Sequence, residues 1–221
     1  MKSARAPGIG MTSQRTRDRM VQRLRERGIA DERVLAAMAA VPRHVFVEEA
    51  LASRAYEDSA LPIGFSQTIS QPYVVAKMIE LLLENNKPGK VLEVGTGCGY
   101  QAAVLARVFE EVYSVERIKA LLERARANLL GLRLSNLRLA HADGAAGLQA
   151  AAPFDAILMA AAARQVPEAL RGQLAPRGRM ILPLHNGSDS QRLVLIERNG
   201  RSFRQSELDA VHFVPLEAGK A

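Results

Sequence analysis

The sequence has 221 residues, of which 48% are hydrophobic and 24% are charged, as is typical of a globular protein with one domain. No apolar run approaches the ~18 residues that span a bilayer, and no apolar core follows the charges at the N-terminus, as it would in a secretory signal. We therefore exclude the membrane and secreted classes and expect a cytoplasmic protein. The single cysteine, Cys98, excludes an internal disulfide, and the four histidines have no metal-ligand spacing, so we expect no metal.

The net charge of +7 is concentrated near the N-terminus, where residues 1–33 contain nine basic and four acidic side chains. Residues 1–14 are predicted to form a disordered basic arm, because small residues dominate and residues 1–11 have no hydrophobic period. Such an arm is able to contact nucleic acid. A solvated helix face with a flexible start explains the same charge, and we favour it, so we expect no stable nucleic-acid partner.

Residues 15–72 are predicted to form a helical cap followed by a long ordered loop. An amphipathic helix is expected over about residues 12–27, and Asp31 is typical of the N-cap of a second helix, which Pro42 ends. The stretch 54–72 contains two prolines, several hydroxyl residues and no helical period. A connection of this length is usually functional.

Strands and helices alternate along residues 73–221, which are predicted to be a cofactor-binding core continuous with the cap, so that 15–221 is one domain. The expected elements are a helix 73–85, a strand 90–94, a helix 101–109, a strand 111–118, a helix 118–131 ended by Gly131, strands 136–144 and 154–163, a short helix and turn 166–178, a strand 179–184, a hairpin 191–208 turning at Asn199-Gly200, and a strand 210–216. This order predicts an α/β fold with a doubly wound, mostly parallel sheet, helices on both faces and a C-terminal antiparallel hairpin.

The stretch from Lys90 to Tyr100, KVLEVGTGCGY, joins a buried strand to a helix through three glycines at alternate positions. Such glycines let the backbone turn sharply and approach a ligand, because no Cβ intervenes. The dinucleotide fingerprint needs a further glycine where Tyr100 stands. An acid, Glu116, ends the next strand, where a carboxylate accepts hydrogen bonds from ribose hydroxyls. The pattern E-x-G-x-G-x-G with this acid resembles the S-adenosylmethionine site of class I methyltransferases; a tight turn without a ligand is the alternative.

Further blocks resemble one family within that group. In order they are LPIGFSQTISQPYVVAKM, VLEVGTGCGYQAAVLA, YSVERI, HADG, APFDAI, AAAR followed by PEAL, and VHFVPL. The set resembles protein-L-isoaspartate O-methyltransferases over residues 15–217, and QTISQP is the discriminating block because most class I methyltransferases lack it. The resemblance implies transfer of a methyl group from S-adenosylmethionine to the free α-carboxyl of L-isoaspartyl residues in damaged proteins and peptides. The ester then closes to a succinimide, which initiates repair. We expect a monomer.

The resemblance also implies roles for individual residues. Ser70 matches an active-site serine that hydrogen-bonds the substrate carboxylate, and Thr68 would lie on the same side of an extended loop. The residues expected to bind the cofactor are Gln67 and Ile69 of the loop, Glu93, Gly95 and Gly97 of the glycine turn, Glu116 with Arg117 at the ribose, and Asp143 with Gly144 at the adenine. The block Val214, Pro215 and Leu216 matches one that shapes the substrate side.

The chemistry suits these residue types. A carboxyl group in water has a pKa of ~4, so at neutral pH it is already an ionised nucleophile and the reaction needs no general base. Attack on a sulfonium methyl joins opposite charges in one displacement. The main work of the protein is to hold the two reactants in line, which contributes roughly 7–11 kcal/mol in well-oriented systems.

Each assignment has a structural alternative. A lone loop serine such as Ser70 is usually a turn hydroxyl, and only the surrounding block favours a functional role. Glu116 is also typical of a helix cap and Asp143-Gly144 of a turn, but we favour the ribose and adenine roles. Cys98, among small residues, is expected to be a small buried hydrophobe rather than a nucleophile.

Two departures from the family pattern and two rival functions stay open. Ser66 stands where many bacterial members have glycine, and Arg164 stands where proline is usual, which leaves the conformation of both segments open. A nucleic-acid methyltransferase is favoured by the basic arm, but the sequence lacks an Asn/Asp-Pro-Pro-Phe/Tyr element and a Pro-Cys nucleophile. A non-catalytic binding module of the same fold is disfavoured by the intact glycine turn, Glu116 and the QTIS loop.

Overall fold

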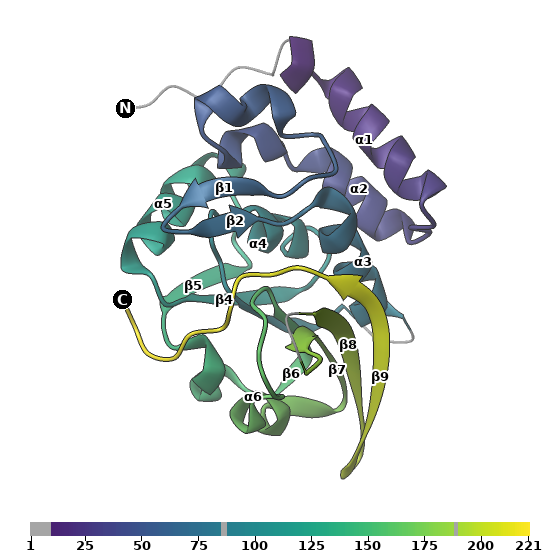
Figure 1. The fold of residues 1–221 in the computed structure, drawn as a ribbon, viewed down its shortest axis with the longest axis vertical. Coiled ribbons are helices and arrows are strands. Elements are labelled where there is room, and N and C mark those ends of the chain that lie inside the picture. Colours follow the sequence, from purple (N-terminus) through teal and green to yellow (C-terminus); the bar gives the residue numbers. More distant parts are fainter. Residues whose placement is uncertain (1–9, 85–87, 188–189) are drawn as a thin grey trace.

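The computed structural model describes residues 10–84, 88–187 and 190–221 (Figure 1). One sheet has seven strands in the order β5-β4-β3-β6-β7-β8-β9, and β1 and β2 form a separate hairpin. The strands are β1 Leu61–Gly64, β2 Gln67–Ile69, β3 Lys90–Val94, β4 Glu111–Glu116, β5 Leu137–His141, β6 Phe154–Met159, β7 Leu174–His185, β8 Gln191–Asn199 and β9 Ser202–Val211. The α-helices are α1 Gln14–Glu26, α2 Glu32–Ala40, α3 Pro72–Leu83, α4 Tyr100–Leu105, α5 Lys119–Leu129 and α6 Glu168–Gly172.

The sheet is parallel from β5 to β7 and antiparallel at β7-β8 and β8-β9. The predicted α/β class, with a mostly parallel sheet and a C-terminal antiparallel hairpin, is therefore confirmed. Strands β4 and β5 lie on one side of β3, while β6 and β7 lie on the other, so the chain order reverses at β3. Sheets of this kind bind ligands in the crevice at the carboxyl ends of the strands where the order reverses.

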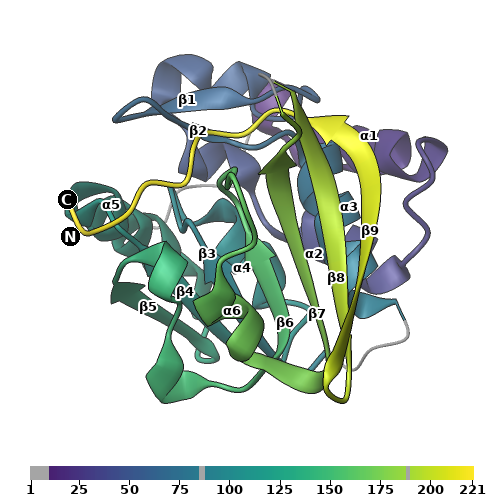
Figure 2. The same ribbon diagram turned by 60° about the horizontal axis from the view of Figure 1, so that its bottom comes forward.

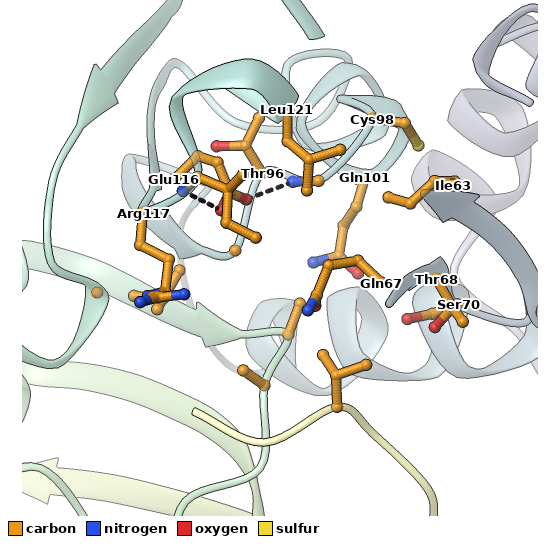
Figure 3. Close-up of a pocket in the computed structure, with 18 of the residues that line it drawn as sticks. Ile63, Gln67, Thr68, Ser70, Thr96, Cys98, Gln101, Glu116, Arg117 and Leu121 are labelled. Atoms are coloured by element: carbon orange, nitrogen blue, oxygen red, sulfur yellow. Dashed lines mark hydrogen bonds between the residues drawn. The ribbon is translucent and has the colours of Figure 1, made fainter. Parts of the chain in front are cut away.

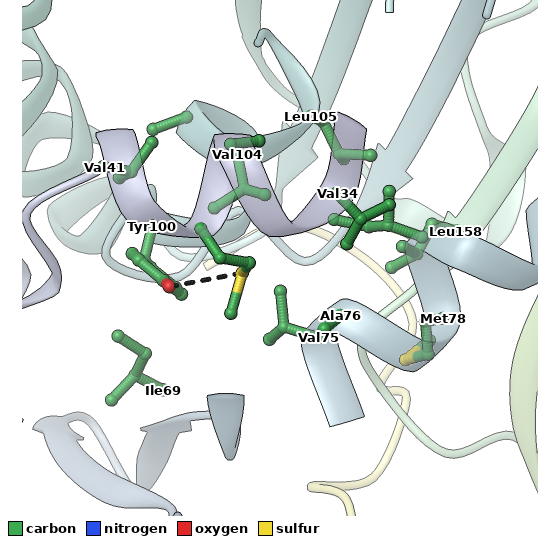
Figure 4. Packing of buried hydrophobic residues seen from close by; sticks show 14 of the residues in the cluster. Val34, Val41, Ile69, Val75, Ala76, Met78, Tyr100, Val104, Leu105 and Leu158 are labelled. Atoms are coloured by element: carbon green, nitrogen blue, oxygen red, sulfur yellow. Dashed lines mark hydrogen bonds between the residues drawn. The ribbon is translucent and has the colours of Figure 1, made fainter. Parts of the chain in front are cut away.

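Apolar side chains cover both faces of the sheet. The larger cluster packs the cap and helices α3, α4 and α5 against one face, and Val34, Val75 and Val104 meet in it (Figure 4). The smaller cluster on the other face includes Leu92 of β3 and Leu170 of α6. A central strand buried on both faces explains why β3 reads as a continuous apolar run rather than an alternating one.

The helical cap follows the sequence prediction closely. Helix α1 buries Met20 and Leu24, and the Asp31 carboxylate caps α2 by accepting from the N–H of Arg33 at 2.9 Å. Residues 1–9 of the predicted arm lie outside the described residues. The described part of the arm contains a short 3-10 helix, Gly10–Thr12, and the Thr16 hydroxyl holds this helix to α1 by donating to the carbonyl of Gly10.

The stretch 54–72 contains a hairpin that the sequence analysis predicted only as a loop. Gly64 pairs with Gln67, which leaves Phe65 and Ser66 as the two turn residues with φ of 54° and 55°. These angles lie in the left-handed region that favours glycine. The Ser66 departure therefore concerns a turn residue held in a glycine-like conformation.

Two helix ends differ from the prediction. Helix α4 stops at Leu105 rather than at 109, because the N–H groups of Arg107 and Val108 bond carbonyls three residues back and tighten the chain into a turn. Gly131 does not end α5 in a left-handed conformation. A 3-10 helix, Leu130–Leu132, continues α5, and Arg133 takes the left-handed conformation with φ of 51°.

Two features of the C-terminal hairpin also differ. The turn lies at Gly200-Arg201, one residue later than predicted, because Asn199 still pairs with Ser202. The predicted strand 210–216 is not separate, since β9 ends at Val211.

The sheet pairing ends where the Gln191 side chain exchanges two hydrogen bonds, of 2.7 and 3.0 Å, with the main chain of Phe213. Beyond this point the chain leaves the sheet and forms a single bridge from Pro215 to Ala162. The segment then crosses the carboxyl edge below the β1–β2 hairpin (Figure 2).

The connection that carries Arg164 is held by its neighbours. Ala163 donates to the carbonyl of Pro183 at 3.0 Å and accepts from the N–H of His185 at 2.9 Å, while Arg164 itself is exposed. The backbone bonds, rather than a proline, fix this segment.

Candidate functional site

A pocket of about 860 Å³, including the part open to solvent, lies at the carboxyl edge of the sheet (Figure 3). Small-molecule sites typically measure roughly 300–1,000 Å³. The predicted site residues that line it are Gln67, Thr68, Ile69, Ser70, Gly95, Gly97, Glu116, Arg117 and Gly144, together with Val214, Pro215 and Leu216 of the C-terminal block. Five stretches far apart in the sequence thus form one cavity, and only Glu93 and Asp143 of the predicted set do not line it.

The glycine turn has the conformation that its composition predicts. Gly95, Gly97 and Gly99 have φ of 96°, 54° and 92°. A Cβ on Gly97 would lie 3.2 Å from Cδ1 of Ile63 in β1, so the hairpin closes directly over the turn. Gly99 is the N-cap of α4, which leaves the first N–H groups of the helix at the pocket edge.

Glu116 is fixed beside this turn by two main-chain donors. Its Oε2 accepts from the N–H of Gly97 at 2.9 Å, and its Oε1 accepts from the N–H of Ile118, also at 2.9 Å. Ile118 is the N-cap residue of α5, so Glu116 holds the residue that precedes the helix and makes no cap hydrogen bond to the helix itself. A carboxylate has about four acceptor positions, so these two bonds orient the group and leave acceptors directed to the pocket for a diol.

Arg117 and Asp143 hold the segment that closes the far side of the pocket. Arg117 Nη1 pairs with Glu217 at 2.8 Å, and its Nε donates to the carbonyl of Gly219 at 3.2 Å. Asp143 accepts from the N–H of Ala145 at 2.9 Å and from the N–H of Gly219 at 2.8 Å. Asp143 thus acts as a turn cap and as an anchor for the C-terminal segment.

Gly144 lines the pocket, and it packs so closely against Val94 that there is no room for a side chain. A Cβ on Gly144 would lie 2.5 Å from Cγ1 of Val94, a distance that requires the backbone or Val94 to move. Its backbone consequently lines the pocket with no side chain in the way.

Glu93 lies beneath the pocket, not in its wall. The side chain is fully buried, and Oε2 is hydrogen-bonded to the Ser114 hydroxyl, whose oxygen lies 2.6 Å from that of the pocket-lining Thr96. Burial raises the pKa of Glu93 to about 8, although the hydrogen bond from Ser114 opposes this rise. At this pKa Glu93 is mostly protonated at neutral pH, and its side chain lies in the core rather than in the wall of the pocket.

This state of Glu93 makes stability depend on pH. A glutamate loses its proton near pH 4.5 in the unfolded chain and near pH 8 in the folded protein. The folded state binds the extra proton between these values, so stability falls as the pH rises through that window. Glu93→Gln cannot lose a proton, so its stability relative to the wild type should increase across the window by a few kcal/mol, on the order of 1.4 per pKa unit. Urea unfolding at several pH values measures this, and a pH-independent difference between the two proteins would contradict it.

Thr68 and Ser70 present their hydroxyls to the same side of the pocket, as predicted for an extended segment (Figure 3). The intervening Ile69 is buried in the core with 4% of its surface exposed. Ile69 lines the pocket as well, so the whole of residues 67–70 forms part of its wall.

Sequence reasoning missed two polar residues of the wall, Thr96 and Gln101. Both are buried and line the pocket, and Gln101 Nε2 has no hydrogen-bond partner among the residues that the structure describes. Their positions within and just after the glycine turn were the available signal. Cys98 also lines the pocket, but burial raises the pKa of its thiol to about 11, which agrees with the prediction of a small buried hydrophobe.

Two kinds of feature are absent from residues 10–84, 88–187 and 190–221. No group of three or more His, Cys, Asp or Glu side chains there is placed to hold a metal ion. No helix in those ranges is both long and apolar enough to cross a bilayer.

The chain is similar to known proteins over nearly its whole length. The family model for protein-L-isoaspartate(D-aspartate) O-methyltransferase matches residues 15–221. A protein-L-isoaspartate O-methyltransferase of Methylobacillus flagellatus is 60% identical, covering 99% of each chain, and one of Dechloromonas aromatica is 62% identical, covering 96% of this chain and 98% of its own. A Plasmodium falciparum structure of that name, in complex with S-adenosyl-L-homocysteine, is 26% identical with a TM-score of 0.81, covering 91% of this chain and 98% of its own. This chain belongs to the protein-L-isoaspartate(D-aspartate) O-methyltransferase family.

Proposed function

We propose that this chain transfers a methyl group from S-adenosylmethionine to the free α-carboxyl of L-isoaspartyl residues in damaged proteins and peptides, initiating repair through a succinimide. The observation that carries the proposal is one pocket that joins the hydroxyls of Thr68 and Ser70 to the glycine turn and Glu116. Membership of the family supports the same reaction.

The residues present fit the cofactor. The positive φ angles of the turn favour glycine, and the three glycines leave the space over β3 free of side chains. Glu116 offers acceptors to the ribose hydroxyls. The unpartnered amide of Gln101 is a donor for a polar group of the ligand. When bound, S-adenosylmethionine supplies an electrophilic methyl group on a sulfonium. Gly95, Gly97, Glu116 and Gly144 would hold it, with Gln67, Ile69 and Arg117 closing the sides.

The chain's own contribution is to orient the substrate carboxylate. Ser70 and Thr68 are neutral donors, so they direct the carboxylate without the strong ion pair that an arginine or lysine would form and that would lower its reactivity. The substrate is ionised at neutral pH, so no side chain has to remove a proton. Val214, Pro215 and Leu216 contribute apolar groups to the lining of the same pocket.

We also propose that the chain acts as a monomer in the cytoplasm, on protein and peptide substrates and without a stable nucleic-acid partner. The single cysteine is free and buried, as suits a reducing compartment. Three of the basic side chains near the N-terminus have acidic partners within the chain: Arg25 pairs with Glu32, Arg27 with Asp58 and Arg33 with Asp31. This supports a solvated helix surface rather than a nucleic-acid site.

Methyl transfer to matched peptides tests the proposed function. The two peptides have one sequence and differ only in an isoaspartyl or a normal aspartyl linkage, and a third reaction contains RNA. We expect label in the isoaspartyl peptide and at least about a hundredfold less in its twin, because the free α-carboxyl is the group that the hydroxyls orient. Equal labelling of the two peptides, or labelling of RNA alone, would reject the proposal.

A further inference from the structure

Arg43 is an arginine buried in the cap beside the segment that carries Ser70. It begins the 3-10 helix Arg43–Phe46, and none of its surface is exposed. Nε donates to the carbonyl of Ala55 at 2.8 Å, and Nη2 donates to the carbonyl of Ser70 at 2.7 Å. The guanidinium also lies over the ring of Tyr100, with Cζ 4.7 Å from the ring centre.

Packing alone does not explain an arginine at this position. Both of its hydrogen-bond acceptors are neutral carbonyls, and Nη1 has no partner among the residues that the structure describes. Burial of a cation in such surroundings is costly and lowers the pKa of Arg43. An apolar side chain of similar volume would avoid that cost. We therefore expect the arginine to serve the groups that its guanidinium contacts.

The guanidinium joins three parts of the active site. Ala55 and Ser70 are the two ends of the segment that contains the β1–β2 hairpin. Tyr100 starts α4, directly after the glycine turn, and lines the pocket. One planar group therefore fixes both ends of the hairpin segment against the element that carries the cofactor turn. The flat, forked guanidinium allows this, whereas the ammonium of lysine has no fixed fork.

We propose that Arg43 is a positioning residue for methyl transfer, which places the Ser70 hydroxyl relative to the methyl donor. The inference rests on the proposed function. Arg43 does not line the pocket, so it acts through Ser70 rather than on the substrate. Because a displacement of a reacting group by 1 Å is able to cost on the order of a hundredfold in rate, loss of this contact should affect turnover more than binding.

A double-mutant cycle tests this role. The variants are Arg43→Met, Ser70→Ala and the double mutant. Each rate is divided by the concentration of folded binding sites, which titration with S-adenosylhomocysteine measures. We expect Arg43→Met to lower kcat for an isoaspartyl peptide by about 10- to 100-fold while the Kd for S-adenosylhomocysteine changes less than about threefold. In the Ser70→Ala background the same change should alter kcat by less than about twofold, because the hydroxyl that it positions is already absent.

Arg179→Met is the matched control. Arg179 is also a buried arginine, on β7, but it pairs with Glu197 at 3.0 Å and with Glu84 at 3.4 Å and does not line the pocket. Its loss should lower the melting temperature and leave kcat per titrated site unchanged.

Arg43→Lys is the second variant if Arg43→Met does not fold. It keeps the charge without the fork, and it too should lose kcat. Two results would overturn the positioning role. One is a wild-type kcat in either Arg43 variant. The other is that Arg43→Met lowers kcat by the same factor in the wild-type and in the Ser70→Ala background. A wild-type protein that does not label the isoaspartyl peptide would overturn the proposed function and this inference with it.

Discussion

Ser70→Ala is expected to lower kcat for methyl transfer to an isoaspartyl peptide by about 10- to 100-fold, and to leave the affinity for S-adenosylhomocysteine within about threefold. The lost interaction is a hydrogen bond to a charged carboxylate, worth about 1.5–3 kcal/mol. Ser70 directly follows β2 and lines the pocket, and in the proposed arrangement its hydroxyl meets the substrate rather than the nucleotide. Initial rates with saturating cofactor, together with calorimetric titration of S-adenosylhomocysteine, separate the two effects.

Ser66→Gly is the control on the same hairpin. Ser66 is exposed, does not line the pocket and has a φ of 55° that glycine adopts freely. It should retain wild-type kcat. If Ser70→Ala instead weakened S-adenosylhomocysteine binding as strongly as it slowed transfer, Ser70 would serve the cofactor and its assigned role would be wrong.

Glu116→Ala is expected to weaken S-adenosylhomocysteine binding by about a hundredfold or more. Two ribose hydroxyls would lose a charged acceptor, at about 1.5–3 kcal/mol for each hydrogen bond. The N–H groups of Gly97 and Ile118 would lose their acceptor as well, so the glycine turn would also be less well held. Calorimetric titration gives the affinity, and thermal unfolding of the free protein reports the loss of the two main-chain bonds.

Glu111→Ala provides the comparison at the other end of the same strand. Glu111 pairs with Arg138 at 3.4 Å and does not line the pocket, so its removal should change the affinity for S-adenosylhomocysteine by less than about twofold. If Glu116→Ala bound S-adenosylhomocysteine as tightly as Glu111→Ala, Glu116 would serve only to hold the N–H groups of Gly97 and Ile118 and would contribute nothing to the nucleotide.

The predictable parts of this protein are those that depend on neighbouring residues. The strand, glycine turn and helix around Gly95 follow from local composition, and Glu116 follows from its place at the end of the next strand. The β1–β2 hairpin was not predicted, because its turn residues, Phe65 and Ser66, are not the glycine or asparagine that such a turn favours. The sequence therefore has no two-residue turn signal at Phe65 and Ser66, where the structure has a hairpin turn.

The parts that escaped prediction depend on contacts between distant residues. Arg43 meets the carbonyl of Ser70 across 27 positions, and Asp143 meets the N–H of Gly219 across 76. The neutral state of Glu93 follows from its burial beneath the turn, which a single sequence does not reveal. Glu93 was therefore predicted to bind the cofactor, whereas its side chain is buried beneath the pocket and does not line it.

A crystal structure with both S-adenosylhomocysteine and an isoaspartyl peptide tests the geometry of the pocket most directly. We expect the ribose hydroxyls within hydrogen-bond distance of Glu116, and the free α-carboxyl held by Ser70 and Thr68 on the side of the ligand where its sulfur lies. A complex in which the Ser70 hydroxyl faces bulk solvent, away from that sulfur, would contradict the proposed arrangement.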